Sequence, residues 1–112
     1  MKVSTILATK GNKLITIAPE QPIQEAVALL EQHNIGAIIA LDDAGKLAGI
    51  ISERDVVRQL NHQDSLLSQP VKSIMTAKVT TCVPQDDLMS VAHVMTERCF
   101  RHMPVMEEGK LL

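Results

Sequence analysis

The side chains in this sequence that could do chemistry gather at two places, one around Ser52 and one around Cys99. In the first, Ser52 precedes Asp55 by three residues, which sets a hydroxyl against a carboxylate. This spacing is close to that of a helix capping box, where the two side chains bind backbone amides of the first turn and contribute about 0.5–2 kcal/mol to stability. On spacing alone, a structural cap is the favoured interpretation of this pair.

The second cluster contains Cys99, Arg101 and His102. Cys99 and His102 superficially suggest a pair of metal ligands, but the sequence holds no second pair with zinc-like spacing, and Cys82 lies far away. The same two residues lack the oxyanion donors and the orienting third group that nucleophilic catalysis needs. We therefore expect no metal site and no enzymatic activity.

Composition limits the classes of function that remain. The 112 residues are 46% apolar and 21% charged, which is typical of one ordinary soluble domain. A net charge of −2 leaves no broad basic surface for nucleic acid or an anionic membrane. The sequence shows neither a secretion signal nor a membrane span, so a cytoplasmic location is expected. The two cysteines are then expected to be reduced and packed as small apolar groups.

The elements that must position these residues occur twice in the sequence. Residues 3–7 align with residues 71–75, and residues 16–19 align with residues 81–84. In each copy four apolar residues then follow with the i, i+3, i+4, i+7 spacing of a helix that buries one stripe. They are Ile23, Ala26, Val27 and Leu30 in the first copy, and Leu88, Val91, Ala92 and Met95 in the second. Two copies of one β-α-β-β-α unit are therefore predicted.

In the first copy we expect a strand at residues 13–17, a helix at 22–34, and strands at 37–41 and 46–51. The continuous apolar run at residues 37–41 fits a strand that is covered on both faces. Ser52 then opens a second helix, with Val56, Val57 and Leu60 as its apolar face.

In the second copy we expect a strand at residues 79–83, a helix capped by Asp86 or Asp87, and a strand at 103–106. Leu112 aligns with Ala48, so the final strand is barely begun and the closing helix is missing. The expected boundaries are 3–60 for repeat 1, 61–70 for a polar linker and 71–112 for repeat 2, all within one module at 1–112. Five methionines fall on expected core positions of the second copy, namely Met75, Met89, Met95, Met103 and Met106.

Three segments carry a resemblance to a known family. They are the Val-x-x-Ile-Met-Thr lead-in at 71–76, the Gly-Ile-Ile-Ser-Glu-Arg-Asp run at 49–55 and Phe-Arg-His-Met-Pro-Val at 100–105. Together with the duplication, they resemble a tandem pair of cystathionine-β-synthase (CBS) domains, a Bateman module, over nearly the whole chain. The resemblance implies an α/β (α+β) fold of two repeats packed sheet to sheet with pseudo-twofold symmetry. It also implies a homodimer and two clefts that can hold adenosine derivatives.

The resemblance further implies which residues bind a nucleotide. Ser52 would lie near phosphate and Asp55 on the ribose, since a carboxylate can accept two hydrogen bonds from a cis-diol. Arg101 and His102 would approach the phosphates, although a solvated basic pair remains the alternative. The predicted nucleotide-binding residues are Ile50, Ser52, Asp55, Val79, Thr80, Arg101, His102, Met103 and Pro104. We expect one complete site at most, because the matching Ser/Thr-x-x-Asp of the other cleft would follow Leu112.

Two functions fit these expectations. In the first, the module senses AMP, ATP or a related adenosyl ligand such as NAD or S-adenosylmethionine, and responds by rearranging its repeats or its dimer. In the second, it is a ligand-free dimerisation and interaction scaffold for an enzyme or transporter. Both imply an unidentified target protein, and neither involves nucleic acid or a membrane.

Overall fold

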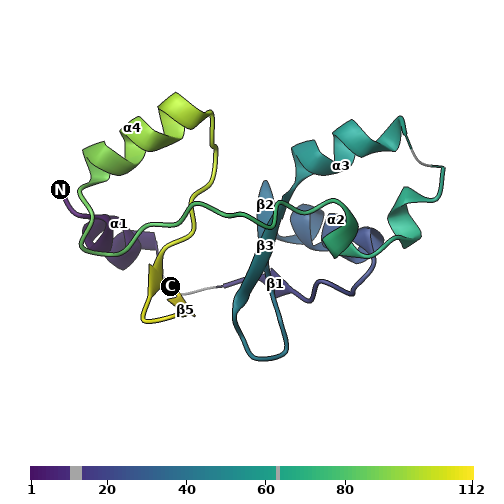
Figure 1. Cartoon of the computed structure of the whole chain (residues 1–112), viewed down its shortest axis with the longest axis horizontal. Helices are drawn as coiled ribbons and strands as arrows, with labels where there is room; N and C mark the ends of the chain where they lie inside the picture. Colours follow the sequence, from purple (N-terminus) through teal and green to yellow (C-terminus); the bar gives the residue numbers. More distant parts are fainter. Residues whose placement is uncertain (11–13, 63) are drawn as a thin grey trace. The chain divides into compact units, whose positions relative to one another are not determined.

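The computed structural model describes residues 1–10, 14–62 and 64–112, and it has the mixed α/β fold that the sequence predicts (Figure 1). The chain forms two compact units. One unit combines Met1–Leu14 with Val79–Leu112, and the other is Ile15–Lys78. We call them the terminal unit and the central unit and describe each by itself. Within the described ranges, every helix is too short or too polar to cross a lipid bilayer.

The central unit is built on a three-stranded sheet in the order β1-β2-β3. β1 (Thr16–Ile17) pairs in parallel with β2 (Ala37–Leu41), and β2 pairs antiparallel with β3 (Leu47–Ser52). Helices α2 (Ile23–His33) and α3 (Glu53–Leu60) both cover the same face of this sheet (Figure 1). Two short 3₁₀ turns follow, η1 (Leu66–Ser68) and η2 (Val71–Ser73). The expected strand at 13–17 is observed as Thr16–Ile17, and Lys13 lies outside the described residues.

The sheet of the central unit is buried on one face and half-buried on the other. Ile38, Ala40 and Ile51 are at most 1% exposed, whereas Ile39 and Ile50 point to the other face and are half-buried. The expectation that β2 is fully covered on both faces is therefore wrong. Successive strand residues point to opposite faces, and the helices pack on only one of them.

The apolar face predicted for α3 is only partly correct. Val56 is 7% exposed and belongs to the core, but Val57 is 65% exposed and Leu60 is 55% exposed. Neighbouring residues of a helix are about 100° apart, and here Val56 faces the sheet while Val57 is turned away from it. α3 thus presents two apolar side chains on its outer surface.

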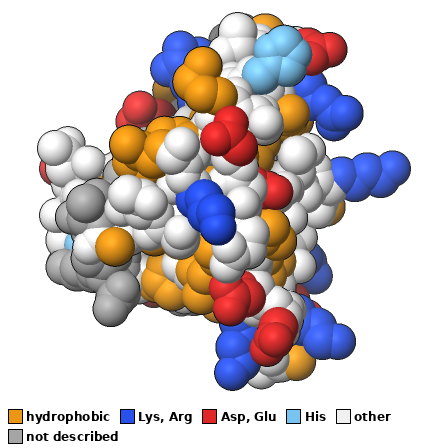
Figure 2. Space-filling model, turned by 90° about the vertical axis from the view of Figure 1, so that its left-hand side faces the viewer, with side chains coloured by type: hydrophobic (Ala, Val, Ile, Leu, Met, Phe, Trp, Pro, Cys, Tyr) orange, Lys and Arg blue, Asp and Glu red, His pale blue; other side chains and the backbone are white. Residues whose placement is uncertain are grey.

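The terminal unit contains α1 (Val3–Lys10), α4 (Leu88–Arg98) and a hairpin of β4 (Met106–Glu107) and β5 (Lys110–Leu111). α4, described along its whole length, has no fully buried side chain. Met89 is 75% exposed, so its expected core position is wrong. Figure 2 shows the surface that lies on the left-hand side of Figure 1, where hydrophobic side chains lie among charged ones. The sequence analysis did not predict α1.

The two strands predicted around Cys82 and Met103 are largely absent. All of residues 79–83 and 103–106 are described, but they form only an isolated parallel bridge between Cys82 and Val105 and the first residue of β4. The Cys82 amide donates to the Pro104 carbonyl at 3.0 Å, and the Met106 amide donates to the Cys82 carbonyl at 2.8 Å. Pro104 has no N–H group, so it cannot extend this pairing in both directions.

The first residues of repeat 2 bind within the central unit, to repeat 1. The Val71 amide donates to the Gln21 carbonyl at 2.8 Å, and the Lys72 amide donates to the Pro19 carbonyl at 2.9 Å. Val71 is fully buried in the core of this unit. The lead-in of the second repeat is therefore a structural part of the first.

The first residues of repeat 1 bind in the corresponding way within the terminal unit. The Val3 amide donates to the Asp86 carbonyl, and the Ser4 amide donates to the Pro84 carbonyl, both at 2.9 Å. These four positions align with those of the central unit, so the two repeats exchange their lead-ins.

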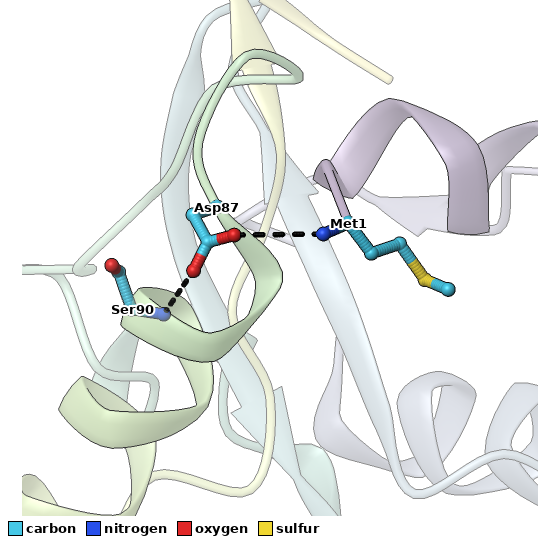
Figure 3. A network of polar contacts seen from close by, with 3 residues as sticks. All are labelled: Met1, Asp87 and Ser90. Carbon is cyan, nitrogen blue, oxygen red and sulfur yellow. Dashed lines mark hydrogen bonds and ion pairs between the residues drawn. The ribbon is translucent and has the colours of Figure 1, made fainter.

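Asp87, one of the two predicted caps, begins α4 and holds the first residue of the chain. One carboxylate oxygen accepts a hydrogen bond from the Ser90 amide at 3.2 Å, and the other lies 3.6 Å from the α-ammonium group of Met1 (Figure 3). The prediction of a cap at Asp86 or Asp87 is confirmed at Asp87.

Candidate functional site

Ser52 and Asp55 form a closed hydrogen-bonded pair where β3 passes into α3. The Asp55 amide donates to Ser52 Oγ at 3.2 Å, and the Ser52 amide donates to Asp55 Oδ2 at 2.8 Å, which completes a capping box. The Ser52 hydroxyl also donates to Asp55 Oδ2 at 2.9 Å. Both side chains are half-buried. The structural interpretation of this pair is therefore confirmed, and Oδ1 of Asp55 remains available to a ligand.

The sheet positions this pair through its register. Ser52 lies opposite Ala37, and Ile50 lies opposite Ile39, so all four residues share the half-buried face of the sheet. The Glu53 amide, at the start of α3, donates to the Gly36 carbonyl at 3.0 Å and fixes the helix to the beginning of β2. The result is an apolar strip that ends in a hydroxyl and a carboxylate.

Ile50 has a second neighbour that the sequence analysis did not select. Its amide donates to the Thr76 carbonyl at 3.0 Å, and the Thr76 amide donates back to the Ile50 carbonyl at 2.8 Å. Thr76 ends the lead-in motif at 71–76, which was used to recognise the family and not to locate a site. The sequence does contain one indication of this contact, because residues 71–75 repeat residues 3–7. Each of these two segments forms backbone hydrogen bonds with the other copy of the repeat.

Gly49 makes this close approach possible. A Cβ atom at Gly49 would lie 2.7 Å from Met75 Sδ and 2.8 Å from the Thr76 carbonyl oxygen. Both distances are shorter than real Cβ contacts, so any other residue would displace the segment. Glycine is needed here for space, because it is the residue that lets two backbones meet.

The other predicted site residues lie in the terminal unit. Val79, Thr80 and Met103 are half-buried, and Pro104 is buried. The bridge between Cys82 and Val105 brings the segment that contains Val79 and Thr80 beside the one that contains Met103 and Pro104.

Arg101 and His102 precede Met103, and both are exposed. The exposure of Arg101 fits either a solvated cation or a group open to an anion. Ile50, Ser52 and Asp55 are thus brought together in the central unit, and the remaining six predicted residues belong to the terminal unit.

The two cysteines differ in environment. Cys82 is 5% exposed, and burial, with a smaller contribution from the nearby Asp86 carboxylate, raises the pKa of its thiol. Such a thiol stays protonated and is a poor nucleophile and metal ligand. Cys99 is exposed and caps the C-terminal end of α4, with its backbone in the left-handed region. The expectation that both cysteines are packed as apolar groups therefore holds only for Cys82. Across the described ranges, no three His, Cys, Asp or Glu side chains are grouped so that they could hold a metal ion.

Comparison with known proteins identifies the family. Residues 3–62 and 71–112 each match the family model of the CBS domain. The chain belongs to the CBS-domain family. The resemblance seen in the sequence is thereby confirmed, and the two matched segments of this CBS-domain chain do not indicate a catalytic family.

The relatives of this CBS-domain chain extend over almost all of it. It is 32% identical over 98% of its length to a 17.7 kDa protein of Acidianus ambivalens, and it spans 65% of that relative. A crystal structure of the CBS-domain protein ATU1752 from Agrobacterium tumefaciens is 36% identical, with a TM-score of 0.93, covering 98% of this chain and 83% of that one.

A second solved structure contains ligands. The CBS domain pair of protein MJ0100, in complex with 5′-methylthioadenosine and S-adenosyl-L-methionine, is 28% identical, with a TM-score of 0.85, covering 98% of this chain and 83% of that one.

Proposed function

We propose that this chain is a regulatory module that binds an adenosyl ligand, an adenine nucleotide of the AMP or ATP type or a relative such as S-adenosylmethionine. The observation that carries the proposal is the Asp55 carboxylate, held at the end of a half-buried apolar strip with one oxygen uncommitted. A pre-oriented carboxylate suits a ribose hydroxyl, and the apolar strip suits a base. The adenosyl ligands of the MJ0100 domain pair support the same class of ligand.

In this proposal the contacts are those predicted from the sequence. Ile50 acts on the base and Asp55 on the ribose, while Ser52, Arg101 and His102 act on phosphate where the ligand carries one. Val79, Thr80, Met103 and Pro104 provide apolar and backbone contacts. Affinity comes from aliphatic groups and hydrogen bonds, because Phe100 is the single aromatic residue of the sequence.

The proposed regulation acts through assembly. Ligand binding changes the arrangement of the repeats, or of a homodimer in the cytoplasm, and so alters an unidentified target protein. Repeat boundaries at 3–60 and 71–112, with a linker at 61–70, are part of this proposal. Each repeat then contributes residues to ligand binding.

A thermal-shift screen with AMP, ATP, NAD and S-adenosylmethionine tests the proposal. A ligand at 100 times its dissociation constant stabilises the folded state by about 2.7 kcal/mol, which is a shift of several degrees for a domain of this size. Asp55→Ala should abolish the shift. The matched control is Asp87→Ala, which also removes a carboxylate cap from a helix but lies outside the proposed contacts. Should no compound move the wild-type midpoint, the proposed ligand class is wrong.

A scaffold function is the second candidate, favoured by the apolar side chains on outer helix surfaces. Val57 and Leu60 lie three residues apart on α3 and are 65% and 55% exposed, and exposed apolar groups that cluster in this way mark interaction surfaces. A stable homodimer that is unaffected by all four compounds, measured by analytical ultracentrifugation, would favour this function over sensing.

A further inference from the structure

Met75 is the methionine that is built into the core of the central unit. The chain has six methionines, all within the described ranges, and among them Met75 alone packs against the buried core cluster. Met1 and Met89, in contrast, are 70% and 75% exposed. Met75 is half-buried, so part of its side chain is open to solvent and to small molecules dissolved in it.

The sulfur of Met75 fills the space that Gly49 leaves open. A Cβ atom at Gly49 would lie 2.7 Å from Met75 Sδ and 2.9 Å from Met75 Cγ, so the side facing Gly49 has no room for a further atom. The backbone on either side of this sulfur is also fixed. The Met75 amide donates to the Val71 carbonyl at 3.0 Å, and the next residue, Thr76, exchanges two backbone hydrogen bonds with Ile50.

The other lead-in carries a different side chain at this position. Residues 3–7 align with residues 71–75, so Leu7 stands where Met75 does. Leucine and methionine replace each other in cores with little loss of stability, so packing alone does not require a sulfur atom. The two side chains differ in chemistry, because a thioether accepts an oxygen atom and becomes a polar sulfoxide.

We propose that Met75 is a redox-sensitive modification site, whose oxidation to the sulfoxide releases the end of the lead-in from β3. Hydrogen peroxide is the oxidant: its O–O bond breaks, one oxygen atom bonds to Sδ, and the other leaves with both protons as water. The sulfur is oxidised by two electrons and the peroxide is reduced by two.

The sulfoxide has two possible places, and both weaken the pairing of Thr76 with Ile50. If it stays against Gly49, a polar oxygen is buried without a hydrogen-bond partner. If it turns to solvent, the core loses the atoms that filled this space. Thr76 lies three residues before Val79, so oxidation loosens the residues that lead into the terminal unit. Methionine sulfoxide reductases restore the thioether, which makes the change reversible.

The test is amide hydrogen exchange of the full chain before and after treatment with hydrogen peroxide, with peptide mass mapping to identify the oxidised methionines. Oxidation of Met75 should speed exchange of the Thr76 and Ile50 amides about 5–150-fold, the range expected for one polar group buried without a partner. Methionine sulfoxide reductase should return exchange to its original rate. No ligand is needed, so the result does not depend on the proposed adenosyl-ligand function.

Two variants separate this site from general oxidation. Met75→Leu introduces the residue of the other lead-in and should keep slow exchange after peroxide treatment. Met89→Leu removes an exposed methionine and should remain as sensitive as wild type. All three proteins keep the exposed Cys99, so any oxidation of that thiol affects them alike.

Three results would overturn the proposal. They are a Met75 that stays reduced while Met89 is oxidised, an oxidised Met75 with unchanged exchange at Thr76, and a Met75→Leu variant as sensitive as wild type. If Met75→Leu does not fold, the wild-type protein that carries a single oxygen at Met75 decides the question by its exchange at Thr76.

Discussion

The Ser52–Asp55 pair caps α3, and in the proposed function the same two side chains also bind the ligand. Because Ser52 accepts from the Asp55 amide, Ser52→Ala should lower the free energy of unfolding by about 0.5–2 kcal/mol. Ser52→Thr keeps an oxygen at the cap and should lose much less. Urea unfolding measures both, and equal stability of the alanine variant and wild type would contradict a capping role.

Cys82 should make stability depend on pH in alkaline solution. Burial raises the pKa of its thiol, so the folded state holds the proton more tightly than the unfolded state does. The free energy of unfolding should therefore be steady below about pH 8.5, the usual pKa of an unfolded thiol, and fall as pH rises towards the folded pKa.

Cys82→Ala should be less stable overall but should lose this alkaline decline, measured by urea unfolding between pH 7 and pH 10. Cys99→Ala is the matched control, because Cys99 is exposed, and it should keep the decline. If the free energy of unfolding of Cys82→Ala fell with pH as steeply as that of wild type, the alkaline decline would come from other titratable groups.

The residues of the candidate site were predictable only in part. Ser52 and Asp55 stand out because a capping box depends on local spacing, which is visible in the sequence. The pairing of Thr76 with Ile50 was missed because it joins residues 26 positions apart, and no local pattern records such a contact.

At the scale of elements, Gly49 determines whether the lead-in can pair with β3. Gly49→Ala should lower the free energy of unfolding by about 1–3 kcal/mol, because the new Cβ would overlap Met75 and the Thr76 backbone. Met75→Ala in the same chain should not restore stability, since the Thr76 carbonyl oxygen still blocks the Cβ atom. Full recovery in the double variant, measured by urea unfolding, would show that the methionine is the sole obstacle.

The elements that the sequence predicts well are those with their own local signals. α2 has a helical apolar stripe, and the β2–β3 hairpin has the Asp42 turn, where Asp42 Oδ1 accepts from the Ala44 and Lys46 amides at 2.9 Å each. The strands expected at 79–83 and 103–106 were wrong, because a strand forms only where a neighbouring segment can pair with it. Pro104 has no N–H group to donate to residues 79–83, and the two segments form a single bridge at Cys82 and Val105. α1 was missed because the N-terminal segment was interpreted only as a repeat of 71–75.

At the scale of the molecule, the exchanged lead-ins predict where a mutation acts. Val71 belongs to repeat 2 by sequence, but it is fully buried in the central unit with residues of repeat 1. Val71→Ala should cost roughly 1.6 kcal/mol or more, about 0.8 kcal/mol for each buried carbon removed plus the cavity. Amide hydrogen exchange should show lost protection in α2 and β2, with smaller changes in α4.

Val3→Ala is the matched variant, because Val3 is 5% exposed in the terminal unit and aligns with Val71. It should produce the opposite pattern, with protection lost in α4 and retained in β2. If each variant instead weakened only its own repeat by sequence, the exchange would be wrong.

The family and the mixed α/β fold were predictable from the duplication and the motifs, because both are properties of the whole sequence and survive local errors. The residue ranges that make up the two compact units were not predictable. A repeat in sequence marks what was duplicated, whereas a unit in space marks what packs together, and here the two differ at residues 1–14 and 71–78.

The exchange of lead-ins has a consequence for how such a chain could have arisen. A gene that encoded one repeat alone would produce a polypeptide whose own first residues have no place to bind within it. Two such polypeptides could bind these residues only by exchanging them, as in a domain-swapped dimer. Fusion of two copies of the gene would then have kept, within one chain, a contact that had formed between two separate chains.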